Sequence, residues 1–199
     1  MFLFYGKVTL RGMKTQLGIS LANLPRLPLS PQVSVGIIRG KQHKDLTELI
    51  ARFALCGHFH FIVGGEWLPD QDSLRRAIRR YTTAVNETLD HPILGRPSTC
   101  LQLRDQLTMA DAQQHPVFIL DFLNRFYDPD VDLSLRQRIL EGCCQRVQLL
   151  SKFKPVFILT QNVLTEEYQR FFPLLASTAD EILDVEENSQ IAELQYSLL

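Results

Sequence analysis

The chain has 199 residues, of which 45% are hydrophobic and 22% are charged, which suits one large globular domain and argues against wholesale disorder. Its 21 Lys and Arg against 22 Asp and Glu give a formal charge of −1, and therefore no global electrostatic attraction to nucleic acid. No apolar run reaches the ~20 residues of a membrane span. The four cysteines form no CxxC pair. We therefore expect a cytoplasmic protein with reduced thiols, no metal site and no membrane association.

Residues 1–31 are predicted to form an extended segment followed by a linker that Pro25, Pro28 and Pro31 interrupt. From residue 32 onward, strands and helices alternate. We expect strands at 33–38 and 58–63, and helices at 46–55, 72–85 and 100–112. Pro92, Gly95 and Pro97 indicate a loop between the last two helices.

The second half continues the same alternation. We expect strands at 116–123, 155–161 and 180–187, and helices at 133–152 and 165–176. Continuous apolar runs such as PVFIL are typical of strands that are buried on both faces of a parallel sheet. The predicted fold class is α/β, a three-layer sandwich with a mainly parallel sheet over residues 32–187, followed by a tail at 188–199.

The loop after the first strand carries the main functional signal. A phosphate-binding loop has the pattern GxxxxGK[ST] between a buried strand and a helix. Residues 40–47 read GKQHKDLT, so Gly40 and Thr47 fit, but Asp45 and Leu46 replace the second Gly and the Lys. Loss of that lysine removes a charge-assisted contact of about 1.5–3 kcal/mol. In the stretch DLTE, we also expect Asp45 to be the N-cap of the helix, closing its N-terminus to anions.

These features resemble the RecA-like ATPase family, including its KaiC-type and recombinase-paralogue branches, over about residues 33–187. The segments that carry the resemblance are VSVGIIRGKQHKDLT, HFHFIVGGE, PVFILDFLNRFYD and PVFILTQ. It implies that Asp121 and Thr47 stand at the Mg²⁺ position. It further implies that Glu66 lies near the glutamate that activates water, and that Gln161 senses the γ-phosphate.

Because the Gly-Lys pair is replaced, we expect a non-catalytic RecA-like protein that acts by binding and needs no cofactor. Its partner would be another protein or a second copy of itself, with DNA as a further candidate, in DNA repair, recombination or their regulation. The alternative is a divergent ATPase that uses Thr47, Glu66 and Asp121 and binds Mg-ATP with Gly40 in its loop. In that enzyme, Lys41 or Lys44 would replace the missing lysine. Asp121 has a simpler interpretation as the end of a strand.

Two further sets of residues carry competing interpretations. The helix predicted over 72–85 carries four arginines: Arg75, Arg76, Arg79 and Arg80. They could form a DNA-binding face, or they could simply be a solvent-exposed helix face. His58 and His60 share one strand face and could ligate a metal, but without an obvious third ligand an ordinary strand is the favoured reading. Trp67 is either an exposed anchor for a partner or packs against the sheet.

Overall fold

The computed structural model describes residues 35–39, 43–111, 115–160 and 165–184. Within these ranges six strands alternate with α-helices. The strands are β1 (Val35–Arg39), β2 (Phe59–Val63), β3 (Pro92–Gly95), β4 (Val117–Leu120), β5 (Val156–Thr160) and β6 (Glu181–Asp184). The helices are α1 (His43–Leu55), α2 (Gln71–Arg79), α3 (Val85–Leu89), α4 (Cys100–Asp111), α5 (Leu133–Leu150) and α6 (Glu166–Ala176), with the 3-10 helix η2 (Phe122–Phe126) after β4.

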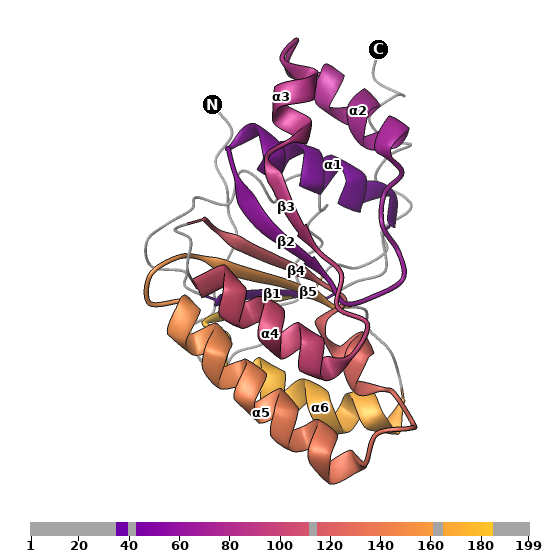
Figure 1. Cartoon of the computed structure of the whole chain (residues 1–199), viewed down its shortest axis with the longest axis vertical. Helices are drawn as coiled ribbons and strands as arrows, with labels where there is room; N and C mark the ends of the chain where they lie inside the picture. Colours follow the sequence, from indigo (N-terminus) through magenta and orange to yellow (C-terminus); the bar gives the residue numbers. More distant parts are fainter. Residues whose placement is uncertain (1–34, 40–42, 112–114, 161–164, 185–199) are drawn as a thin grey trace, which may run out of the picture.

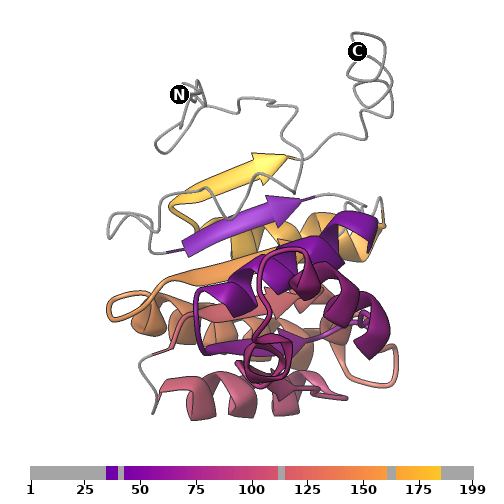
Figure 2. The same ribbon diagram turned by 90° about the horizontal axis from the view of Figure 1, so that it is seen from above.

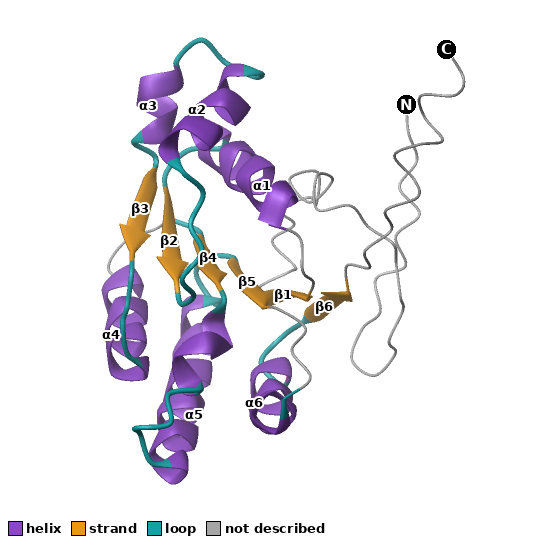
Figure 3. Ribbon diagram, turned by 90° about the vertical axis from the view of Figure 1, so that its right-hand side faces the viewer, coloured by secondary structure: helices purple, strands orange, loops and turns teal. Residues whose placement is uncertain are grey.

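All the strands are parallel and form one sheet in the order β3-β2-β4-β5-β1-β6. Helices α1, α2 and α3 cover one face of the sheet, and α4, α5 and α6 cover the other (Figures 1 and 3). Figure 2 shows β6 beyond β1 at one edge of the sheet. The predicted α/β three-layer sandwich is therefore confirmed.

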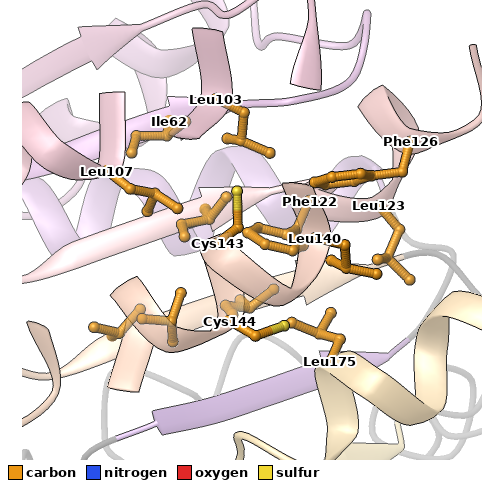
Figure 4. Packing of buried hydrophobic residues seen from close by; sticks show 14 of the residues in the cluster. Ile62, Leu103, Leu107, Phe122, Leu123, Phe126, Leu140, Cys143, Cys144 and Leu175 are labelled. Atoms are coloured by element: carbon orange, nitrogen blue, oxygen red, sulfur yellow. The ribbon is translucent and has the colours of Figure 1, made fainter. Parts of the chain in front are cut away.

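The larger core lies between the sheet and helices α4, α5 and α6. Alternate residues of the central strands, such as Val117 and Ile119 of β4, point into this layer, as period-2 geometry requires. Figure 4 shows how Cys143 and Cys144 of α5 lie among these apolar side chains. Both strand faces are covered, which explains why the apolar runs in the sequence are continuous rather than alternating.

A second core lies on the α1 face of the sheet. Phe118 and Leu120, the alternate residues of β4, pack here with Leu46, Leu49 and Ile50 of α1. Trp67 is half-buried and packs against the same cluster, as the second of its two interpretations predicts. This arrangement fixes α1 by its side chains over the middle of the sheet.

Two predicted boundaries are wrong around residues 72–95. The helix expected over 72–85 ends at Arg79, and a separate short helix α3 follows at Val85. Residues 92–95, expected to be a loop, form the edge strand β3. Pro92 is tolerated because it is the first residue of an edge strand, where no neighbouring strand needs its missing N–H.

Strand β4 also ends earlier than expected, at Leu120 rather than residue 123. Asp121 adopts a left-handed backbone conformation, and the chain then turns into η2. Within the described ranges, no helix combines the length and apolar character needed to cross a membrane.

Candidate functional site at the carboxyl edge of the sheet

The carboxyl ends of parallel strands meet at one edge of a sheet, and in this fold class ligands bind there. Two backbone hydrogen bonds tie neighbouring strand ends together at this edge. The Gly64 amide donates to the Leu120 carbonyl (2.7 Å), and the Asp121 amide donates to the Leu159 carbonyl (2.8 Å). The structure thus places Gly64, after β2, and Asp121, after β4, at neighbouring positions of this edge, beside Leu159 near the end of β5. Gly40, Lys41 and Gln161 lie outside the described residues.

Asp121 lies at the centre of this edge. It is 7% exposed, and its backbone has φ 52° and ψ 46°, the one positive φ among described residues other than glycine. A left-handed conformation at a residue with a side chain is uncommon, and such strain clusters at functional sites. The side chain is directed at the β2 end, because a Cβ added to Gly65 would lie 2.2 Å from Asp121 Oδ2. Only glycine fits opposite this carboxylate.

The segment Gly64–Glu66 is held by donors from its two neighbouring strand ends. From η2, Asn124 Nδ2 lies 3.4 Å from the Gly64 carbonyl oxygen, and Arg125 Nη2 donates to the Gly65 carbonyl oxygen (3.2 Å). From the loop after β3, Arg96 Nη2 lies 3.5 Å from the Glu66 carbonyl oxygen. The Glu66 side chain itself is exposed.

The predicted phosphate loop does not have the expected layout. Strand β1 ends at Arg39 and α1 begins at His43, so only residues 40–42 connect them. The prediction that Asp45 is the N-cap of this helix is wrong, because α1 begins two residues earlier, at His43. Leu46, at the position of the lysine, is 4% exposed and packs in the α1 core. Thr47 is half-buried on the same helix.

The arginines of the predicted basic face do not form a uniformly free positive surface. Arg80 Nη1 forms an ion pair with Glu48 Oε2 of α1 (3.3 Å), and the same glutamate also binds Arg52 (3.1 Å). Arg76 donates to the Ser73 hydroxyl (3.0 Å). Arg75, Arg76, Arg79 and Arg80 remain near the surface, so their role as DNA-binding candidates is a matter for experiment.

Four histidine rings gather at the opposite, amino-terminal edge of the sheet. The centroid of His58 lies 4.7 Å from that of His91 and 5.5 Å from that of His115, and His60 lies 6.2 Å from His115. His58 lies one residue before β2 and His60 lies within it, and both rings are near the ring of His115. In the part of the chain that the structure describes, no group of three His, Cys, Asp or Glu side chains is arranged to hold a metal ion.

The cysteines are all free thiols, and three of them are buried. Burial raises the pKa of Cys143 to about 12, and it does the same for Cys144. Thiolate is the reactive form of cysteine, so these two buried thiols stay protonated near neutral pH and are poor nucleophiles.

Neither the family models nor the curated proteins compared with this chain give a match. The site must therefore be interpreted from its own geometry. Sequence reasoning identified Glu66 and Asp121 but missed Arg96, which follows strand β3. The missing signal was β3 itself, because without that strand Arg96 has no place at the carboxyl edge.

Proposed function

We propose that the chain is a non-catalytic, RecA-like binding protein, which acts through a protein partner, a second copy of itself or DNA. DNA repair, recombination or the regulation of these processes is the setting that the resemblance implies. The order of the strands supports this proposal. One strand, β5, separates β1, which precedes the degenerate loop, from β4, which precedes Asp121, as in RecA-like domains.

The observation that carries the non-catalytic part is the connection from β1 to α1. A phosphate-binding loop needs free backbone amides ahead of the helix to surround the phosphates. Here three residues, 40–42, separate β1 from α1, and the side chain at the lysine position belongs to the core. Phosphoryl transfer depends almost entirely on the positioning of the phosphates and on positive charge near them. A short connection that does not surround the phosphates and a leucine at the lysine position would remove both contributions to catalysis.

Calorimetric titration with ATP and with ADP, each with Mg²⁺, tests this proposal. We expect no saturable heat at millimolar nucleotide. Micromolar binding that is abolished by Asp121→Asn and by Lys41→Ala or Lys44→Ala would instead support the divergent ATPase.

The binding role needs its own measurement. Sedimentation of the full chain over a wide concentration range tests self-association. Binding to duplex DNA at increasing salt, with Arg75→Glu and Arg79→Glu as variants, tests the basic face, because phosphate contacts make affinity fall steeply with salt. A monomer at every concentration that shows no salt-dependent DNA binding would leave only a protein partner.

A further inference from the structure

Arg96 and Arg125 stand on either side of the carboxyl end of β2. β2 lies between β3 and β4 in the sheet, Arg96 follows β3, and Arg125 follows β4 in η2. Their guanidinium groups contact the carbonyl oxygens of two consecutive residues, Glu66 and Gly65. The two side chains therefore converge on one short stretch of backbone, although 29 positions separate them in the sequence.

The carboxyl end of β2 is a topological switch point, where the connections after adjacent strands leave to opposite faces of the sheet. After β2 the chain crosses to the face covered by α2 and α3, whereas after β3 and β4 it crosses to the face covered by α4 and α5 (Figure 3). Adjacent strands whose connections leave to opposite faces open a crevice at their carboxyl ends, where α/β proteins bind ligands. This point is separate from the β1–β5 boundary, where the degenerate loop lies.

The N–H donors of Arg96 and Arg125 at the carboxyl end of β2 are only partly used in hydrogen bonds. A guanidinium offers five N–H groups, and each of these two arginines makes one hydrogen bond to the described part of the chain. The Nε atom of Arg125 is buried and has no hydrogen-bond partner there. Neither arginine forms an ion pair with a described carboxylate.

We propose that Arg96 and Arg125 form a binding site for a phosphate group at the carboxyl end of β2, on a small phosphorylated ligand or an inorganic phosphate. Guanidinium groups match phosphate oxygens with paired N–H donors, and two of them supply the charge for a dianion. The Gly64–Gly65 pair adds no side chain of its own between the two arginines, and the Asp121 carboxylate packs against Gly65. Asp121 and Glu66 oppose the anion electrostatically and so limit its affinity.

Calorimetric titration of the full chain with inorganic phosphate and with glycerol 3-phosphate, at constant ionic strength, tests the site. We expect saturable binding that Arg96→Gln and Arg125→Gln each weaken about tenfold, the loss for one charge-assisted contact. Asp121→Asn should tighten binding because it removes a negative charge beside the anion. Asparagine tolerates the left-handed backbone of this position, so the variant should keep the local structure. Arg138→Gln, at an exposed arginine of α5, is the matched control and should bind as the wild type does.

The outcomes separate this site from the proposed function. Arg96 is exposed, so Arg96→Gln should stay folded even if Arg125→Gln does not, and thermal unfolding of each variant checks this. The tighter of the two probes identifies the source of the phosphate. Absence of saturable heat up to about 10 mM of both probes, or unchanged affinity in Arg96→Gln, would overturn the site. Nucleotide binding lost in Arg96→Gln but kept in Lys41→Ala would report this site and not an ATPase.

Discussion

Replacement of Gly65 by Ala should destabilise the protein because of Asp121. The new Cβ would lie 2.2 Å from Asp121 Oδ2 and 2.9 Å from its Cβ and Cγ. Asp121 cannot easily move away, since its amide is bonded to Leu159 and its carbonyl oxygen accepts from the Asn124 amide (3.0 Å). Overpacking of this kind costs about 1–3 kcal/mol, and the tightness of this contact favours the upper half of that range.

Urea unfolding, followed by fluorescence of the single tryptophan, Trp67, measures this loss. Gly142→Ala in α5 is the matched control, because a Cβ there meets nothing within 4 Å. It should stabilise the helix by about 0.5–1 kcal/mol. In an Asp121→Gly background the clash disappears, so the cost of Gly65→Ala should fall by at least about 1 kcal/mol. An equal cost in both backgrounds would refute the reasoning.

Three other predictions follow from burial and capping. Leu46→Lys should cost at least about 2 kcal/mol of stability in urea and should not create ATP binding, because it places a charge in the core. In a native thiol titration at pH 8, Cys56 should react at once, while Cys143 and Cys144 should need denaturant. Asp132→Asn should flatten the loss of stability in acid below about pH 4, measured by unfolding at several pH values.

The sign of the Asp132 effect follows from its hydrogen bonds. The Ser134 hydroxyl, followed by the backbone amides at the start of α5, holds the pKa of Asp132 below its ordinary value of 3.8. The unfolded chain then binds the proton more readily than the folded protein. The contribution is therefore present above that value and is lost as the pH falls through the folded pKa. Unchanged acid sensitivity in Asp132→Asn would contradict this assignment.

The sequence predicted the layers of the fold because continuous apolar strands such as β4 and β5 leave no alternative to a covered parallel sheet. It failed at β3, whose four residues begin with proline and include Leu94, an exposed side chain. β3 forms because it can pair with the edge of β2. The local sequence does not predict that pairing. The start of α1 was also predicted too late, at Leu46 with Asp45 as N-cap, whereas the helix already begins at His43.

For the site, the resemblance assigned Glu66 and Asp121 to one nucleotide site, but the sequence did not reveal how the two residues are arranged. The left-handed backbone of Asp121 and its approach to Gly65 arise from contacts between residues that are far apart in the chain. Arg125 came directly after a predicted strand, yet its target was unknown until the end of β2 was placed beside it. Strand ends can be predicted from apolar runs, whereas the partners of polar side chains require the strand order.

The position of β1 in the sheet has a consequence for how the chain folds during synthesis. Val35 pairs with Val156 and Gly36 with Glu181, so the first strand finds both neighbours only in the last part of the domain. The pairing of β2 with β3 and β4 can form far earlier on the ribosome. Contacts between residues far apart in the chain form slowly. Until β5 and β6 are made, β1 would therefore remain an unpaired apolar segment of the kind that chaperones bind. A nascent chain arrested before β5 should therefore protect β2 and β4 from proteolysis while leaving β1 accessible.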